Sequence, residues 1–233
     1  QKLIHFVFQT GFLMKPLFDQ AKQAPKRVVY AEGEESRVLQ AIQQVIEEGL
    51  AFPVLVGRPD VIESRMNELS INLKAGEDFE IINPQQDERY YEYWSYYHEL
   101  MGRKGVSPTQ AKNIVRTQTS VIAALMLKRG DADAMICGTV GVFSIHLRHV
   151  TNIIGKEAGA KNYSTLTALV LPSGTFFLGD THVTADPSAE EVAEMTMLTA
   201  KTVQQFGIKP RIALLSHSNF GSRSSKSAIK MRD

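Results

Sequence analysis

The sequence predicts an α/β protein in which a doubly wound, mostly parallel sheet is joined to a second lobe. Short apolar segments alternate along the chain with longer segments of helical period. Such alternation favours parallel strands, because each parallel pair needs a crossover connection that a helix usually supplies. The turn sequence Pro172-Ser173-Gly174 is typical of a β-hairpin and indicates the second lobe. We expect the boundary between the lobes within residues 138–155.

The first half of the chain supplies the elements of the first lobe. Val38, Ile42 and Ile46 lie about one helical turn apart, which predicts a helix over 34–50. The other predicted elements are strands at 27–31, 52–56 and 79–82, a helix over 60–69 and an aromatic helix over 90–97. We interpret these aromatic rings as packing on neighbouring elements, because the segment lacks the interleaved Lys and Arg of single-strand binders.

The second half begins with a strong helix signal. Ser107 is a good N-cap residue and Pro108 suits the first helical position, so we expect one long helix that ends at Gly130. The elements predicted after it are strands at 132–138, 164–171 and 176–180, a helix from 186 to 206, and a last strand at 211–216.

Composition excludes several classes of protein. Lys and Arg number 26 against 25 Asp and Glu, so no overall field favours nucleic acid or an anionic membrane. Cys137 is the sole cysteine, which excludes an intramolecular disulfide framework and fits a reducing cytoplasm. Apolar runs such as 166–171 are too short to span a bilayer. The two ends of the sequence are typical of a piece of a longer protein.

Ligands of open α/β sheets collect beyond the carboxyl ends of strands, and four such ends carry polar residues. The first is the acidic turn that begins at Glu32, which either positions a base or complements the dipole of the next helix. The second combines Gly138 and Thr139 with Arg148, where small residues admit a ligand and a guanidinium can bind phosphate. No metal is expected there, since His146 and His149 have no third ligand near them in the sequence.

The other two ends lie in the second lobe. Asp180 follows the hairpin and, with His182, forms either a general-base pair or a simple turn. Four further residues offer hydroxyl, amide and backbone donors for an oxyanion or phosphate, namely Ser216, Ser218, Asn219 and Ser222. The sequence has no G-x-S-x-G elbow, G-x-G-x-x-G loop or Walker lysine loop. The residues alone therefore predict an α/β protein with an anion-binding cleft.

Several segments resemble the phosphate acetyl/butyryltransferase family, most closely its version fused behind a malic-enzyme domain. They are VVYAEGEESRVLQA, RKGVSPTQA, GDADAMICGTVG, DPSAEEVAE and FGIKPRIALLSHSNFGS. The resemblance implies a two-lobed, three-layer αβα fold similar to isocitrate and isopropylmalate dehydrogenases, and a homo-oligomer. It also implies three parts: a linker helix over 1–22 from a preceding malic-enzyme domain, a first lobe over 23–145, and a second lobe over 146–233 that is incomplete at its C-terminal end.

The resemblance also assigns site residues and departures from them. Arg148 matches a family arginine that contacts phosphate, and Ser216, Ser218 and Ser222 match a serine-rich loop. Met101 stands where active members carry an arginine, and Thr181 replaces a common cysteine. The motif with the catalytic aspartate is expected beyond the end of the sequence, so no catalytic residue is assigned within it.

Two functions follow as hypotheses from this resemblance. The first is a regulatory and oligomerisation module with weak or no catalysis, which binds acetyl-CoA or a related acyl-CoA and is linked covalently to a malic-enzyme domain. The second is an active acyltransferase in which Arg103 takes the role of the missing arginine. A purely structural role as an oligomerisation platform is a third possibility. In either case NADP and Mg²⁺ or Mn²⁺ would belong to the malic-enzyme domain, which converts malate to pyruvate, and this chain would hold no cofactor of its own.

Overall fold

The computed structural model describes the backbone of residues 2–171, 173–219 and 221–233, and side chains from Met14 onward. Pro172, part of the predicted turn, lies outside the described residues. The chain forms two compact units. The first unit comprises residues 20–155, and the second comprises 1–19 together with 156–233.

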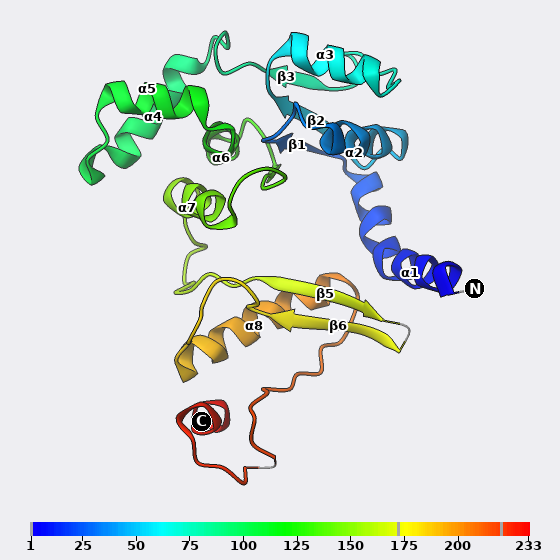
Figure 1. The fold of residues 1–233 in the computed structure, drawn as a ribbon, viewed down its shortest axis with the longest axis vertical. Helices are drawn as coiled ribbons and strands as arrows, with labels where there is room; N and C mark the ends of the chain where they lie inside the picture. The colour runs from blue at the N-terminus through cyan, green and yellow to red at the C-terminus, as the bar shows by residue number, and fades with distance from the viewer. Residues whose placement is uncertain (1, 172, 220) are drawn as a thin grey trace. The chain divides into compact units, whose positions relative to one another are not determined.

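The first unit contains a four-stranded parallel sheet with the order β3-β2-β1-β4. Strands β1, β2 and β3 are labelled in Figure 1. Its strands are β1 (Lys26–Tyr30), β2 (Ala51–Val56), β3 (Glu80–Ile82) and β4 (Ala134–Ile136). Val29 aligns with Val54 on β2 and with Met135 on β4, so β1 is an inner strand. The predicted parallel sheet is confirmed, although β4 is shorter than the segment 132–138.

The connections of this sheet reverse direction beside β1. The chain moves outward from β1 to β2 and β3, then returns to place β4 on the opposite side of β1. Helices α2 (Ser36–Glu47) and α3 (Pro59–Glu68) make the outward crossovers, and three helices precede β4. Such a reversal is the topological switch point at which doubly wound sheets bind ligands, and here it lies between the ends of β1 and β4.

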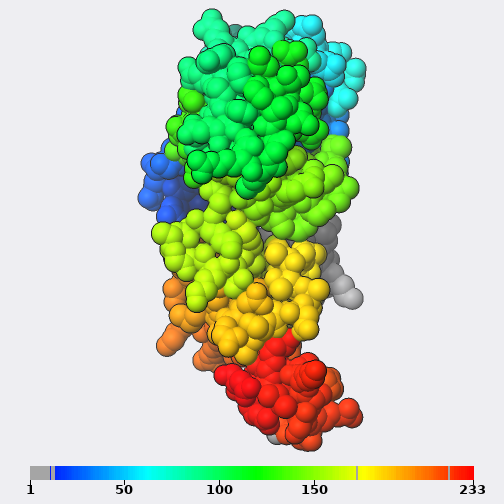
Figure 2. Space-filling view, turned by 90° about the vertical axis from the view of Figure 1, so that its left-hand side faces the viewer, coloured from blue at the N-terminus to red at the C-terminus, as the bar shows by residue number. Residues whose placement is uncertain are grey.

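Apolar side chains bury both faces of the sheet. Tyr30 and Leu55 pack with α2 and α3, whereas Val29 and Val54 pack in a second cluster on the other face. That second cluster includes residues of α4 (Tyr90–Met101), α5 (Pro108–Thr117) and α6 (Thr119–Arg129). Because successive strand residues alternate between clusters, the period-2 geometry of the strands produces the three αβα layers. In the space-filling view, α4 and α5 form much of the outer surface of this unit (Figure 2).

The single long helix predicted from Ser107 is wrong, because the structure divides it into α5 and α6. Gln118 separates the two helices with extended dihedrals, φ −108° and ψ 95°. The two helices lie in different environments. Helix α6 is buried from Ser120 to Met126, whereas α5 has only one buried face. The predicted ends are confirmed, since Ser107 forms a capping box and Gly130 ends α6 with φ 82°.

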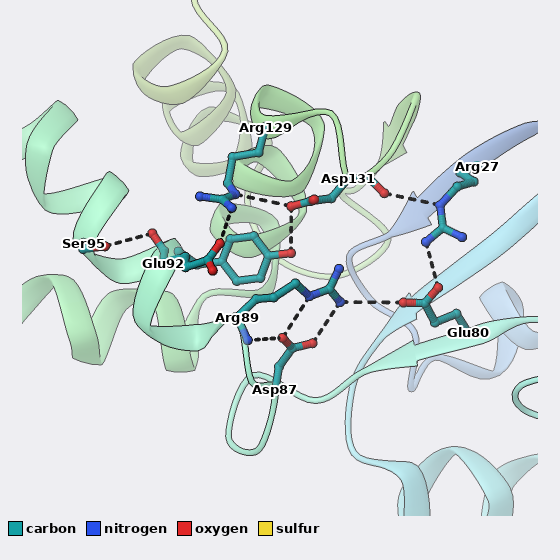
Figure 3. A network of polar contacts seen from close by, with 9 residues as sticks. Arg27, Glu80, Asp87, Arg89, Glu92, Ser95, Arg129 and Asp131 are labelled. Carbon is teal, nitrogen blue, oxygen red and sulfur yellow. Dashed lines mark hydrogen bonds and ion pairs between the residues drawn. The ribbon is translucent and has the colours of Figure 1, made fainter.

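A polar network joins the amino ends of the strands to the α4–α6 layer (Figure 3). Arg27 on β1 donates to Glu80 on β3 at 2.7 Å, and Arg89 forms an ion pair with Asp87 at 3.1 Å. The labelled members are Arg27, Glu80, Asp87, Arg89, Glu92, Ser95, Arg129 and Asp131. The network lies at the edge opposite the switch point and satisfies its own charges, so we assign it a structural role.

The second unit contains the predicted hairpin. Strands β5 (Leu166–Leu171) and β6 (Gly174–Gly179) pair antiparallel, and Phe177 lies 5.3 Å from the Phe206 ring that follows helix α8. Its helices are α8 (Ala189–Gln205), α9 (Lys226–Arg232) and part of α1 (Lys2–Gln23), while α7 (Phe143–Ile153) belongs to the first unit. Among the described residues, no helix is long and apolar enough to cross a membrane.

The predicted strand at 211–216 is wrong. The structure assigns this segment no regular secondary structure, and Ile212, Leu214 and Leu215 are 53%, 48% and 78% exposed. A β-branched and apolar sequence forms a strand only where a neighbouring strand supplies hydrogen bonds. The serine-rich segment that follows therefore does not lie at the end of a strand.

Candidate ligand-binding site

The switch point of the first unit brings together two residues that lie 106 positions apart. Glu32 follows β1 and Gly138 follows β4, and the backbone N–H of Gly138 donates to both carboxylate oxygens of Glu32 at 3.1 and 3.2 Å. The Glu32 side chain is only 9% exposed. The first and second predicted strand ends therefore lie together at the switch point.

Two more side chains hold the backbone of the 138–141 loop. Arg37 donates from α2 to the carbonyl of Thr139 at 3.1 Å. The Nε2 of His146, on α7, lies 2.8 Å from the carbonyl oxygen of Val140. Gly138 and Gly141 have φ values of 100° and 103°, which glycine adopts without the strain of a side chain. The loop thus has a defined conformation at the place where a ligand is expected.

The acidic turn after β1 also bonds to its other neighbour. Glu34 accepts a bidentate pair from the Arg58 guanidinium and a further hydrogen bond from the Arg58 backbone, all at 2.8–2.9 Å. These hydrogen bonds from Arg58 lower the pKa of Glu34. Glu32 thus bonds to the loop after β4, whereas Glu34 bonds to the turn after β2. Both carboxylates connect loops, a role that neither sequence interpretation of this turn included.

The two histidines of α7 have separate partners. His149 Nδ1 lies 2.7 Å from the hydroxyl of Ser120 on α6, whereas His146 contacts the 138–141 loop. Burial, together with Arg148 and His146, lowers the pKa of His149, so its neutral form is favoured. Among the described residues, no group of three His, Cys, Asp or Glu side chains lies close enough to hold a metal ion.

Cys137 and Arg148 are two further polar residues close in sequence to the 138–141 loop. Arg148 is exposed on α7, and its positive charge opposes the burial that raises the pKa of Tyr97. Burial and the nearby Glu32 carboxylate raise the pKa of Cys137. The thiol therefore stays protonated at neutral pH and lacks the thiolate character of a nucleophile.

In the second unit, the Asp180 side chain accepts hydrogen bonds from the backbone of the turn that follows it. Its carboxylate accepts the backbone N–H of Val183 at 3.2 Å and of Thr184 at 3.0 Å. Thr181, which the resemblance places at a cysteine position, contacts the Thr167 hydroxyl at 2.9 Å. These contacts favour the structural interpretation of Asp180, whose carboxylate bonds to local backbone.

The serine-rich segment forms a compact loop through its own hydrogen bonds. Ser216 Oγ accepts from the Ser218 backbone at 3.2 Å, and Ser218 Oγ accepts from the Arg223 backbone at 3.1 Å. The backbone N–H of Ser222 donates to the Asn219 carbonyl at 3.0 Å. Phe220, within this segment, lies outside the described residues. Ser216, Asn219 and Ser222 are exposed, so their remaining donors are open to solvent.

The predicted site residues divide between the two units. Gly138, Thr139 and Arg148 belong to the first unit, and the other predicted residues belong to the second: Asp180, Ser216, Ser218, Asn219 and Ser222. The roles of Glu32 and His146 at the 138–141 loop were missed. The sequence signal for the Glu32 contact is an acidic residue two positions after one strand and a glycine two positions after another.

Met101 and Arg103 differ in their surroundings. Met101 ends α4 and is 8% exposed within the cluster that includes Tyr97 and Val115. Arg103 lies in the short 3-10 helix Gly102–Lys104 and is exposed. A buried apolar side chain thus occupies the position where the resemblance places a phosphate-binding arginine.

Comparison with known proteins identifies relatives of two kinds. The family model for phosphate acetyl/butaryl transferase matches residues 12–233. The chain is 52% identical over 231 residues to the NADP-dependent malic enzyme of Escherichia coli (strain K12), covering 99% of this chain and 30% of that protein. It is also 52% identical over 232 residues to the NAD-dependent malic enzyme of Rhizobium meliloti (strain 1021), with coverage of 99% and 30%. The chain thus spans about 30% of the length of these malic enzymes.

A solved structure supports the fold assignment. A phosphotransacetylase from Streptococcus pyogenes matches with a TM-score of 0.84 and 25% identity, over 94% of this chain and 65% of that one. The α/β fold with its parallel sheet is therefore the fold of phosphotransacetylases.

Proposed function

Because the chain belongs to the phosphate acetyl/butaryl transferase family, we propose that it is an acyl-CoA-binding regulatory region of a malic enzyme. In this proposal acetyl-CoA, or a related acyl-CoA, binds the region and changes the activity of a covalently linked malic-enzyme domain. The region itself has weak or no acyl transfer activity.

The observation that carries this proposal is the burial of Met101. Acyl transfer to phosphate develops negative charge, which an arginine at this position would stabilise. Met101 supplies no charge and packs against apolar residues of the α4–α6 layer. Loss of one such donor reduces the rate on the order of a hundredfold or more. Arg148 is exposed, and the N–H groups of Thr139, Val140 and Gly141 donate no hydrogen bond within the described part of the chain, so these groups remain available for binding.

Coupling between the two regions follows from thermodynamic linkage. If acetyl-CoA changes the affinity of the malic-enzyme domain for malate, malate must change the affinity for acetyl-CoA by the same factor. The linked activity would be oxidative decarboxylation of malate to pyruvate with a nicotinamide coenzyme and Mg²⁺ or Mn²⁺. The identity is 52% to both the NADP-dependent and the NAD-dependent relative, so this region does not discriminate between the coenzymes.

The proposal extends to assembly and location. We place the protein in the cytoplasm, since its one cysteine is free and its half-buried thiol has no disulfide partner. Residues 1–22, mostly helix α1, are proposed as the link from the malic-enzyme domain. A homo-oligomer is also proposed, through which regulation would act on several active sites.

A kinetic assay on the malic enzyme that contains this region tests the regulatory role. We expect acetyl-CoA to change the KM for malate or kcat, and Arg148→Ala to weaken this response at least tenfold in acetyl-CoA concentration. Arg116→Ala on α5, whose guanidinium lies over the Tyr90 ring, is the matched control and keeps the response. Malate kinetics that do not change with acetyl-CoA would exclude the regulatory role.

The alternative is an active phosphate acetyltransferase, which the exposure of Arg103 two positions after Met101 favours. This alternative predicts phosphate-dependent release of CoA from acetyl-CoA, abolished by Arg103→Ala. Release of CoA at rates typical of an enzyme would replace the regulatory proposal with this one.

A further inference from the structure

The 138–141 loop at the switch point is held by side chains from three other elements of the first unit. Glu32 accepts the Gly138 N–H, Arg37 donates to the Thr139 carbonyl and His146 bonds to the Val140 carbonyl. Three consecutive residues are thus fixed by three different side chains. Ordinary surface loops have few such contacts, because water satisfies their backbone groups.

Two of these contacts engage the carbonyl groups of Thr139 and Val140, and among the described residues the backbone N–H groups of the same two are left without a bond. In the described part of the chain, the Thr139, Val140 and Gly141 N–H groups donate no hydrogen bond to a protein acceptor. Successive backbone N–H groups in a loop with left-handed residues are suited to bind the oxygen atoms of a phosphate or a carbonyl. The loop therefore offers donors at the position where a doubly wound sheet binds its ligand.

The Val140 carbonyl determines the tautomer of His146. A carbonyl oxygen only accepts, so Nε2 of His146 carries the proton in the 2.8 Å contact. In neutral His146, Nδ1 is then an acceptor. It is buried without a hydrogen-bond partner and lies 3.9 Å from Oε1 of Glu32. An amide in place of the Glu32 carboxylate would supply the donor that this nitrogen lacks.

The absence of a side chain at Gly141 leaves space for the His146 ring. A Cβ at this position would lie 2.8 Å from His146 Nε2, closer than real side chains allow. The φ of 103° is also unfavourable for any other residue. The conformation of the loop and the position of the ring therefore depend on each other.

We propose that Glu32 and His146 are positioning residues for ligand binding: they fix the 138–141 backbone so that its free N–H groups are presented to an acyl-CoA or phosphate group. This inference rests on the proposed function for the identity of the ligand. The fixing of the loop itself is a property of the unliganded protein.

Amide hydrogen exchange of the 233-residue chain without ligand tests the positioning. We expect Glu32→Ala to speed exchange of the Gly138 amide by at least about tenfold, since it removes a hydrogen bond to a charged acceptor. Glu32→Gln keeps an acceptor oxygen, which is neutral, and adds a donor for His146 Nδ1, so its Gly138 amide should exchange more slowly than that of Glu32→Ala. Glu34→Ala is the matched control, because this residue bonds to Arg58 on the other side of β1. Equal exchange in Glu32→Ala and wild type, or equal loss in Glu32→Gln and Glu32→Ala, would overturn the proposal.

A second pair of variants keeps the test decisive if Glu32→Ala does not fold. His146→Gln retains a side-chain N–H that can donate to the Val140 carbonyl, whereas His146→Phe fills the space without a donor. We expect faster exchange of the Gly138 amide, the hydrogen-bonded amide of the same loop, only in His146→Phe, because release of the Val140 carbonyl loosens the loop. Acceleration equal in both variants, or absent from both, would contradict the assignment.

Titration of the same variants with acetyl-CoA connects the loop to the ligand. We expect Glu32→Gln to bind as wild type does and Glu32→Ala to bind at least tenfold more weakly. Wild-type affinity in Glu32→Ala, with its loop loosened, would overturn the role in ligand binding. If wild type itself does not bind acetyl-CoA, the proposed function fails, and the exchange data still decide whether Glu32 and His146 fix the loop.

Discussion

The hydroxyl of Ser120 lies 2.7 Å from Nδ1 of His149 and joins helix α6 to helix α7 inside the first unit. Ser120 is 3% exposed, so its hydroxyl has little access to water. The pair fixes the His149 ring beside Arg148, the arginine that the proposed function assigns to ligand binding. Helix α7 is thereby anchored to the core through a polar contact as well as through apolar packing.

We predict that Ser120→Ala lowers the free energy of unfolding by about 1–2 kcal/mol, because it leaves a partly buried ring nitrogen without its partner. The change is measured by urea denaturation at pH 7.5. Ser95→Ala in α4 is a matched control: its hydroxyl bonds only to the Glu92 carbonyl at an exposed position. Its effect should stay within about 0.5 kcal/mol. Equal effects of the two substitutions would contradict the structural role of Ser120.

The lowered pKa of His149 predicts a pH dependence of stability. The ordinary value is 6.5, and the folded protein disfavours the protonated form. Below that pH the unfolded chain binds more protons at this residue than the folded protein does, so stability falls as the pH decreases from 6.5. Urea denaturation at pH 7.5 and 5.5 should show a smaller loss of stability in His149→Gln than in wild type. An identical loss in both proteins would show that His149 does not contribute.

Tyr93 should contribute to stability through its hydroxyl. The side chain is fully buried, its hydroxyl donates to Asp131 at 3.0 Å, and burial raises its pKa. We expect Tyr93→Phe to cost about 1.5–3 kcal/mol in unfolding free energy, since the acceptor is charged. Tyr90→Phe removes a hydroxyl that bonds to the Lys112 carbonyl at an exposed position, and it should cost less than about 1 kcal/mol. A Tyr93→Phe protein as stable as Tyr90→Phe would contradict this account of the network.

Substitutions at Met101 test whether an arginine can be accommodated at this position. We expect Met101→Arg to destabilise the protein by roughly 3 kcal/mol or more, because it places an unpaired charge in the α4–α6 cluster. Met101→Leu nearly conserves the volume and should cost less than about 1.5 kcal/mol. Thermal denaturation and phosphate-dependent release of CoA are measured on both variants. A stable Met101→Arg protein that releases CoA would show that this position tolerates the arginine of an active enzyme.

Periodicity in the sequence predicted most of the first unit. The alternation of strands with amphipathic helices located β1, β2, α2 and α3, and the capping residues Ser107 and Gly130 located helix ends. The prediction of a strand at 211–216 was wrong because strand formation depends on a partner strand, which the residues of the segment do not encode. The break at Gln118 was not predicted, because periodicity does not show that a helix changes direction when one part becomes fully buried.

The candidate site was predicted only in part, for a physical reason. Gly138 and Thr139 were identified because small residues follow a strand, which is a local pattern. The bond between Glu32 and Gly138 joins positions 106 apart, and the fold brings them together through the strand order. The two alternatives considered for the acidic turn, a base or a dipole partner, both used nearby residues and therefore missed the contact.

Calorimetric titration of the chain with acetyl-CoA, with and without phosphate, tests the central claim most directly. We expect saturable binding without turnover, weakened at least tenfold by Arg148→Ala and unchanged by Arg116→Ala. Heat from continuous turnover in the presence of phosphate would show an active acyltransferase. Absence of binding by the wild-type chain under both conditions would contradict the claim that this region binds acyl-CoA.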